Sequence, residues 1–300
     1  MNGEDREVSK EEIVGFIGLG VMGAPMSANI VKAGYDVRLY DAAPGVAAAH
    51  AAKVGGTPVE DAKDLAEAGV IVTMLPTSKI VRSVLLEEDG SLKIPFKPGT
   101  VIADMSSSDP NDTVETGRLL AAHGVHLVDA PVSGARPRAE DATLAIMLGA
   151  DDEDAAKRAI PVIETMSRAI YRTGKLGTGD AMKALNNFVA ATSFVATAEA
   201  LVAGQRFGLD PHTMIEVLND STGKTFQSLV VFEPHIVEKQ FASGFALPLI
   251  TKDIRIARDL QHSVGHAAPV TEVVVAAFEE ALEQLGNVDH TLAYTVWEDK

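Results

Sequence analysis

The stretch IVGFIGLGVMGAPMSANIVKAGYDVRLYD, residues 13–41, contains the pattern that decides the fold. A short apolar run at 13–19 is followed by a helix-like segment at 23–33 and by a second apolar run at 36–41. Strand, turn, helix and strand in this order predict one βαβ unit, in which the two strands are parallel.

The same pattern continues along the first half of the chain. Further short apolar runs follow, most of them separated by helical patterns, at 69–76, 99–106, 125–131, 144–150 and 169–174. They predict a doubly wound, mainly parallel sheet with helices on both faces. After Gly174 the strand signals stop, and the sequence predicts long helices at 180–206, 211–219, 224–239, 248–264 and 269–285. We therefore expect a flexible tail at 1–12, an α/β domain at 13–174 and an all-helical domain at 175–300.

Composition narrows the functional classes. The net charge of −16 argues against nucleic-acid binding, which needs clustered Lys and Arg, and it disfavours an anionic membrane surface. Cysteine is absent, which excludes disulfides and thiolate zinc sites and fits a reducing compartment. Without a signal peptide or an uninterrupted apolar run of about 18 residues, we expect a cytoplasmic protein with no membrane partner.

The first turn has the spacing G-x-G-x-x-G at Gly18, Gly20 and Gly23. On its own this spacing is a weak signal, but here it follows a predicted strand and opens a predicted helix. The first glycine permits a tight turn, the second permits close approach of a pyrophosphate, and the third permits close packing of helix on strand. We expect a dinucleotide to contact the whole turn, which consists of Gly18, Leu19, Gly20, Val21, Met22 and Gly23.

Asp41 ends the next predicted strand, at about the offset of 20 residues expected for the acid that binds the adenosine ribose. Ala42, Ala43 and Pro44 follow it, so no neighbouring arginine is available for a 2′-phosphate. This favours NAD over NADP. The alternative is a glycine-rich turn with a surface aspartate.

Three loops follow predicted strands and should lie at the edge where doubly wound sheets bind ligands. They contain Leu75 and Pro76, then Ser107, then Ser133 and Gly134. The hydroxyl of Ser133 and the backbone N–H of Gly134 are suited to a carboxylate. Any one of these loops by itself is better explained as an ordinary turn; their convergence on one edge favours a ligand site.

Lys183 and Asn187 stand four residues apart near the start of a predicted helix, and so on one face of it. Reduction of a carbonyl by hydride needs a proton donor, and the reverse reaction needs a base, which a partly desolvated lysine can supply. Asn187 would hold the ammonium group or a substrate hydroxyl in line. The alternative is a first-turn lysine whose ammonium group reaches water.

At these residues the chain resembles the β-hydroxyacid dehydrogenase family, which includes 3-hydroxyisobutyrate dehydrogenase and tartronate semialdehyde reductase. The resemblance covers nearly the whole chain from about residue 13. Its motifs are GFIGLGVMGAPMSANIVKAGYDV (15–37), DAPVSGARPRAEDATLAIMLGA (129–150), GTGDAMKALNN (177–187) and LITKDIRIA (249–257).

The resemblance implies a Rossmann domain followed by a helical domain, with the active site between them. It implies that Lys183 is the catalytic acid/base, supported by Asn187, and that Ser133 and Gly134 bind the substrate carboxylate. Ser107 would contact the nicotinamide end of the cofactor, and Lys252 would reach the same cleft. The family uses no metal and commonly forms homodimers or homotetramers.

Two departures from the family pattern leave questions open. Ala135 replaces a usual glycine, and Arg136 and Arg138 follow it, either as surface charge or as ligands for an extra anionic group. Asp180 stands where an uncharged residue is common. An acid one turn before Lys183 favours the charged lysine, which leaves the pH optimum open.

We therefore expect an NAD-dependent oxidoreductase that interconverts a short 3-hydroxy acid, a small carboxylate, and its semialdehyde. The alternatives are a noncatalytic dinucleotide-binding module and an imine or semialdehyde reductase that uses NADPH. His262 and His266 are four residues apart, but without an HExxH acid or a thiolate no metal site is expected.

Overall fold

The computed structural model describes residues 12–298, and the expected tail lies outside the described residues except for Glu12. Glu12 forms an ion pair with Arg158. The chain divides into two compact units, Met1–Lys183 and Ala184–Lys300.

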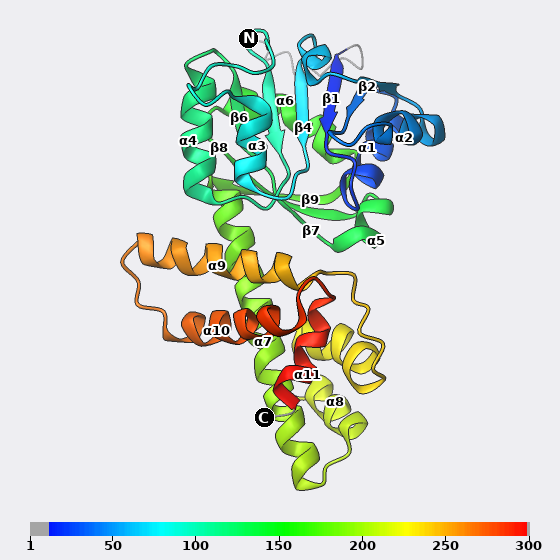
Figure 1. The fold of residues 1–300 in the computed structure, drawn as a ribbon, viewed down its shortest axis with the longest axis vertical. Coiled ribbons are helices and arrows are strands. Elements are labelled where there is room, and N and C mark those ends of the chain that lie inside the picture. Colours follow the sequence, from blue (N-terminus) through cyan, green and yellow to red (C-terminus); the bar gives the residue numbers. More distant parts are fainter. Residues whose placement is uncertain (1–11, 299–300) are drawn as a thin grey trace, which may run out of the picture. The chain divides into compact units, whose positions relative to one another are not determined.

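A mainly parallel sheet forms the centre of the first unit, as predicted (Figure 1). Its parallel strands lie in the order β3-β2-β1-β4-β5-β6, the strand order of a Rossmann fold. Their bounds are β1 (Ile13–Ile17), β2 (Asp36–Tyr40), β3 (Thr57–Pro58), β4 (Val70–Thr73), β5 (Val101–Asp104) and β6 (His126–Asp129).

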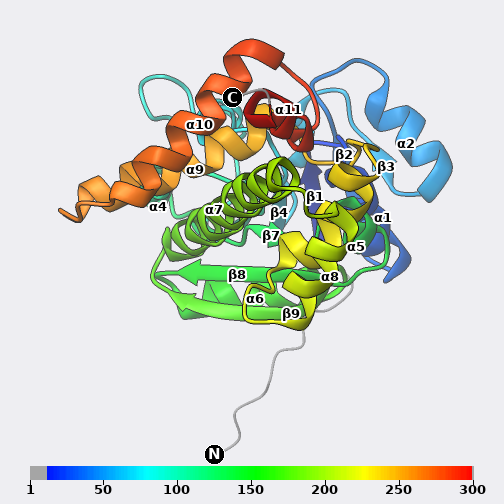
Figure 2. The same ribbon diagram turned by 90° about the horizontal axis from the view of Figure 1, so that it is seen from below.

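Three more strands extend the sheet beyond β6. They are β7 (Val132–Ser133), β8 (Leu144–Ala150) and β9 (Ser167–Gly174). β8 is antiparallel to β6 and to β7, whereas β9 runs parallel beside β8 (Figure 2). The strands β3 and β7 were not predicted, because two residues are too few to show an alternating pattern.

Helices cover both faces of this sheet. They are α1 (Gly23–Lys32), α2 (Val46–Val54), α3 (Ser78–Leu85), α4 (Pro110–Ala121), α5 (Ala135–Glu140) and α6 (Glu153–Glu164), with a 3₁₀ turn, η1, at Ala62–Leu65. α5 was not predicted.

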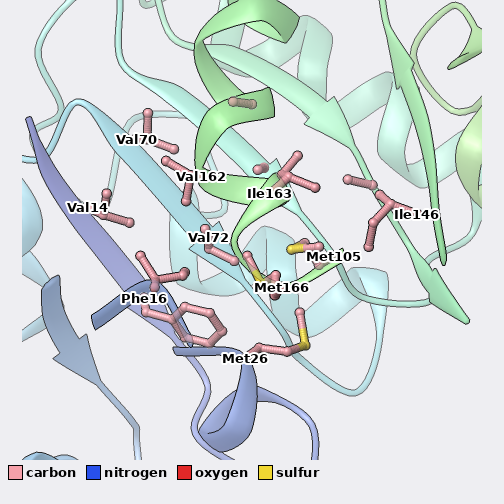
Figure 3. Close-up of a cluster of buried hydrophobic side chains, with 14 of the residues drawn as sticks. Val14, Phe16, Met26, Val70, Val72, Met105, Ile146, Val162, Ile163 and Met166 are labelled. Carbon is pink, nitrogen blue, oxygen red and sulfur yellow. The ribbon is translucent and has the colours of Figure 1, made fainter. Parts of the chain in front are cut away.

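Alternate strand residues supply two separate hydrophobic clusters, one on each face of the sheet. Phe16 packs on one face with Met26 of α1 and Val162 of α6 (Figure 3). Its neighbour Ile17 belongs to the opposite cluster, with Leu85 of α3. Each such buried side chain contributes about 1.5–3 kcal/mol of transfer free energy, so the alternating pattern fixes which face of each strand is covered.

The second unit is helical around one aromatic cluster. The ring of Phe194 lies 5.1–6.3 Å from the rings of Phe232, Phe278 and Trp297. The elements are the later part of α7 (Thr178–Phe207), α8 (Pro211–Asp220), the π-helix η2 (Gln227–Val237), α9 (Leu247–Ser263), α10 (Pro269–Leu285), η3 (His290–Leu292) and α11 (Ala293–Glu298).

Two features of this unit differ from the prediction. The helix expected at 224–239 is a shorter π-helix that contains Pro234, a residue without the N–H that a regular α-helical turn requires. The short helices η3 and α11 were not predicted.

Among the described helices, α7 alone is long and apolar enough to cross a membrane, by length and composition. This helix contains no uninterrupted apolar run of about 18 residues, because small and neutral polar residues interrupt it. Its length and composition are weak evidence for a membrane span, since core helices pass the same test, and 44% of that window is buried in the structure.

Candidate active site

The carboxyl ends of four parallel strands lie in register at one edge of the sheet. Ile17 of β1 pairs with Thr73 of β4, Thr73 with Asp104 of β5, and Asp104 with Asp129 of β6. The strand order reverses between β1 and β4, which is where sheets of this kind bind ligands. The segments that follow these four strands contain most of the predicted site residues of the first unit: Gly18–Gly23, Leu75, Pro76, Ser107, Ser133 and Gly134.

Glycine occupies the three positions of the first turn for different reasons. Gly18 has φ +98°, and a Cβ there would lie 2.4 Å from the Met74 carbonyl oxygen. A Cβ at Gly23 would lie 1.8 Å from the Gly18 carbonyl oxygen. A Cβ at Gly20 would meet nothing within 4 Å. The fold therefore requires Gly18 and Gly23, whereas Gly20 borders open space that a ligand can fill.

Unused backbone donors lie beside that space. Among residues 12–298, no acceptor is found for the N–H groups of Gly20, Val21 and Met22. The helix that follows, α1, has no side-chain cap. Free N–H groups at the positive end of a ten-residue helix fit a pyrophosphate, so the residues present suit a dinucleotide.

Asp41 joins the turn to the end of β2. Its Oδ2 accepts a hydrogen bond from the Leu19 N–H at 2.8 Å, and its Oδ1 accepts one from the Ala43 N–H at 2.9 Å. Each carboxylate oxygen has a second lone pair. The carboxylate therefore retains the capacity to accept hydrogen bonds from ribose hydroxyls.

The loops after β4 and β5 are joined directly. Ser106 Oγ accepts a hydrogen bond from the Leu75 N–H at 2.9 Å. Ser107, the predicted cofactor residue, is the next residue and is half-buried. Pro76 is exposed.

The segment expected to bind a carboxylate has an unusual backbone. Ser133 lies in β7, Gly134 has φ +141°, and Ala135 has φ +55°, a left-handed conformation that favours glycine. Arg136 Nε lies 2.7 Å from Glu140 Oε1, so that charge is paired. The aliphatic part of Arg138 packs on Gly134, where a Cβ would come within 2.6 Å of Arg138 Cδ.

Helix α7 carries the predicted acid/base and passes from the first unit into the second. Lys183 is half-buried and is the last residue of the first unit. Asn187, one turn further on, is buried, and its Nδ2 donates to Asp253 Oδ2 of α9 at 2.6 Å. Lys252 Nζ lies 3.2 Å from Asp253 Oδ1. Asp253 thus brings Asn187 and Lys252 together within the second unit.

Two further buried acids in the first unit had no predicted role. Asp104 accepts hydrogen bonds from Thr73 Oγ1, the Ser106 N–H and Ser108 Oγ at 2.8–3.1 Å. Asp129 accepts hydrogen bonds from the Gly177 and Asp180 N–H groups, both at 2.8 Å. The only sequence signal for either was an acid that ends an apolar run.

Burial changes the titration of two of these acids. It raises the pKa of Asp129 to about 6, against the effect of the N–H groups of Asp180 and Gly177. It also raises the pKa of Asp180 well above its usual range, and the nearby carboxylates of Asp129 and Asp104 add to this. Both carboxyl groups therefore hold their protons to a higher pH than an ordinary aspartate does.

No group of three or more His, Cys, Asp or Glu residues that could hold a metal ion is found among residues 12–298. His262 Nε2 lies instead 2.8 Å from Glu272 Oε1 of α10.

Comparison with known proteins accounts for both units. Residues 13–174 match the family model described as the NAD binding domain of 6-phosphogluconate dehydrogenase. Residues 177–297 match the one described as NAD-binding of NADP-dependent 3-hydroxyisobutyrate dehydrogenase. The chain belongs to the β-hydroxyacid dehydrogenase family.

Individual relatives in this family match over most of their length. The 2-(hydroxymethyl)glutarate dehydrogenase of Eubacterium barkeri is 37% identical, over 95% of this chain and 94% of that one. The NAD-dependent L-serine dehydrogenase of Pseudomonas aeruginosa is 32% identical, over 90% and 92%. A solved structure of Mycobacterium tuberculosis 3-hydroxyisobutyrate dehydrogenase with L-serine has a TM-score of 0.86 at 34% identity, over 96% and 99%.

The chain is therefore an NAD(P)-dependent oxidoreductase of hydroxy acids that acts on a CH–OH group, and its cofactor is NAD, with NADP the less favoured alternative. An imine reductase from Pseudomonas sp. also matches, with a TM-score of 0.60 at 17% identity over 96% of this chain and 99% of that one. That similarity shows the fold alone, and the imine reductase alternative fits less well.

Proposed function

We propose that this dehydrogenase interconverts a short 3-hydroxy acid and its semialdehyde, with Lys183 as the general acid/base. One observation carries the proposal. The start of α7 is hydrogen-bonded to Asp129 at the edge where the glycine turn and the Ser133–Gly134 segment leave the sheet. The groups proposed to bind the dinucleotide, to bind the substrate carboxylate and to transfer the proton therefore all belong to the first unit.

In this proposal the substrate carboxylate accepts hydrogen bonds from the Ser133 hydroxyl and the Gly134 N–H. Lys183, as the neutral amine, removes the proton of the substrate hydroxyl as the carbonyl forms. Bound NAD would supply the hydride acceptor for the substrate carbon that bears this hydroxyl. In the reverse direction the Lys183 ammonium group returns the proton to the developing alkoxide. The role of Lys252 rests on the family resemblance alone, whereas that of Asn187 rests on its spacing from Lys183 and on the resemblance.

The turn residues Gly18–Gly23 would bind the pyrophosphate, and Asp41 would bind the adenosine ribose. Leu75, Pro76 and Ser107 would lie along the nicotinamide half. A 2′-phosphate at Asp41 would meet a carboxylate instead of a cation, which supports NAD as the preferred cofactor.

Arg138 favours a substrate with a second carboxylate. Its stem packs on Gly134, and no ion pair of its guanidinium is found in the described part of the chain, whereas Arg136 is paired with Glu140. We therefore rank 2-(hydroxymethyl)glutarate, the substrate named for the Eubacterium relative, above 3-hydroxyisobutyrate and L-serine.

We further propose that the enzyme is cytoplasmic and a homodimer or homotetramer. Support for an oligomer comes from large apolar side chains on the surface of the second unit. Val189, Phe207 and Val273 are each more than 60% exposed. Sedimentation as a monomer at micromolar concentration would exclude it.

The test is NADH formation, followed by absorbance at alkaline pH, with these three acids and either NAD or NADP. We expect turnover with NAD preferred and kcat/KM highest for the dicarboxylate. Arg138→Ala should lower kcat/KM for the dicarboxylate about tenfold or more, the effect of one lost hydrogen bond to a charged group. The kcat/KM of this variant for 3-hydroxyisobutyrate should stay within about twofold of the unsubstituted value.

Arg136→Ala is the matched control, because that arginine is already paired with Glu140. Equal effects of the two variants would overturn the role of Arg138. No turnover of any acid, with NADH still bound, would favour the noncatalytic dinucleotide-binding module over the proposed function.

A further inference from the structure

Asp129 caps a helix that begins almost fifty residues further along the chain. It is the last residue of β6 and is completely buried. Its Oδ1 accepts a hydrogen bond from the Gly177 N–H and its Oδ2 accepts one from the Asp180 N–H, both at 2.8 Å. These N–H groups belong to the start of α7, where backbone donors have no partner inside the helix. The carboxylate therefore fixes the first turn of α7.

Two glycines make room for this carboxylate. A Cβ at Gly149, the partner of Asp129 across the sheet, would lie 2.4 Å from Asp129 Oδ1. A Cβ at Gly179 would lie 2.8 Å from Asp129 Oδ2. The site thus encloses a carboxylate from both sides and leaves little freedom in where α7 begins.

A second tether holds the same turn. Asp180 Oδ1 accepts a hydrogen bond from the Ser108 N–H at 3.2 Å, and Oδ2 is 2.7 Å from Thr113 Oγ1. Ser108 follows Ser107 directly. The first turn of α7 is therefore joined to the end of β6, to the segment after β5 and to α4.

These contacts connect two parts of the proposed reaction. Asp129 lies four residues before Ser133, and Asp180 lies three residues before Lys183, all in the first unit. We propose that Asp129 is a positioning residue that sets the place of Lys183 relative to the Ser133–Gly134 segment. The inference rests on the proposed function, because it assumes that Lys183 transfers the proton.

The test compares Asp129→Asn with Asp152→Asn. Asn keeps the size of the side chain but turns an NH₂ group toward one of the two N–H donors. Asp152 is the matched control because it accepts hydrogen bonds from the Asp154 and Ala155 N–H groups at the start of α6, which carries no proposed site residue. Amide hydrogen exchange, kcat, KM and the NADH dissociation constant are measured for both variants.

For Asp129→Asn we expect faster exchange in peptides covering 177–183 and a fall in kcat of about 10- to 100-fold, the scale of a misplaced catalytic group. KM and NADH affinity should stay within about twofold. Asp152→Asn should speed exchange only near 153–156 and leave kcat unchanged. Unchanged kcat in Asp129→Asn, or an equal loss in both variants, would overturn the inference.

If Asp129→Asn does not fold, amide exchange in the unsubstituted chain tests whether Asp129 anchors the start of α7. The Gly177 and Asp180 amide protons should then exchange as slowly as those inside α7, and rapid exchange would overturn it. A chain that turns over none of the acids contradicts the proposed function and with it the positioning role. Exchange in 177–183 still tests the anchoring alone, so the two failures are distinguishable.

Discussion

At the scale of single residues, the site contains two buried acids whose pKa values are raised. Asp129 and Asp180 are both buried, and Asp129 accepts a hydrogen bond from the Asp180 N–H. The carboxylate of Asp104 in β5 lies nearby. Because the pKa of Asp180 is raised, its carboxyl group carries less negative charge one turn before Lys183 than an ordinary aspartate would carry.

The pair should make stability depend on pH. In the unfolded chain Asp titrates near pH 4, whereas burial raises the pKa of Asp129 to about 6 and that of Asp180 also upward. The folded state therefore binds protons more tightly, and its unfolding free energy falls as pH rises from about 4 through about 6. Asp180→Asn imitates the protonated acid. We expect its unfolding free energy, relative to the unsubstituted chain, to increase over that range.

Urea unfolding at pH 4.5 and 7 measures this difference. Asp152→Asn is a suitable comparison, because the Ala155 N–H lowers the pKa of Asp152. That carboxylate is ionised in both the folded and the unfolded chain from pH 4.5 to 7, so the effect of its removal should stay nearly constant over this range. A constant difference between Asp180→Asn and the unsubstituted chain across both pH values would contradict the raised pKa of Asp180.

The sequence predicts some of these residues but not others, and the difference has a physical reason. Lys183 and Asn187 stand out because their spacing places both on one helix face. Asp129 and Asp253 act on residues 48–66 positions away, and no local pattern encodes such a pairing. An acid at the end of an apolar run was visible, but its partners were not.

At the scale of elements, the turn before α1 contains one glycine that the fold requires and another that a ligand would require. Gly23 allows α1 to pack against the Gly18 carbonyl, so the fold requires it. Gly20 faces open space and lies outside the left-handed region.

Gly20→Ala should therefore leave the unfolding midpoint unchanged and weaken NADH binding by about tenfold or more, because the methyl group occupies space next to the unused N–H donors. Gly23→Ala is the comparison, and it should lower stability as well. Fluorescence titration with NADH and thermal unfolding separate the two effects. Unaltered NADH affinity in Gly20→Ala would contradict a pyrophosphate at this turn.

Strands and long helices were predictable because their patterns extend over several residues. The four inner parallel strands were each expected within a few residues of their observed bounds, since both faces are buried. The π-helix η2 was expected as an ordinary helix, because hydrophobic spacing does not distinguish the two. Two-residue strands and helices of fewer than two turns, such as α11, are too short to show a periodicity.

At the scale of the whole molecule, each unit has its own hydrophobic core, and the family models match the two halves separately. The change from strands to helices was visible at Gly174, where β9 ends. The division of the chain by contacts falls nine residues later, at Lys183, because α7 begins in one unit and ends in the other. A helix shared in this way shows no break in its sequence pattern.

The proposed reaction depends on Lys183 as the general acid/base, and one comparison tests this role most directly. The turnover of Lys183→Ala is measured beside that of the unsubstituted enzyme with its best 3-hydroxy acid, and NADH affinity is measured for both. We predict that kcat falls by about 10²–10⁴-fold, the usual contribution of a general acid/base. NADH affinity should stay within about twofold, because the dinucleotide turn is intact. Turnover of Lys183→Ala at the unsubstituted rate would contradict the account.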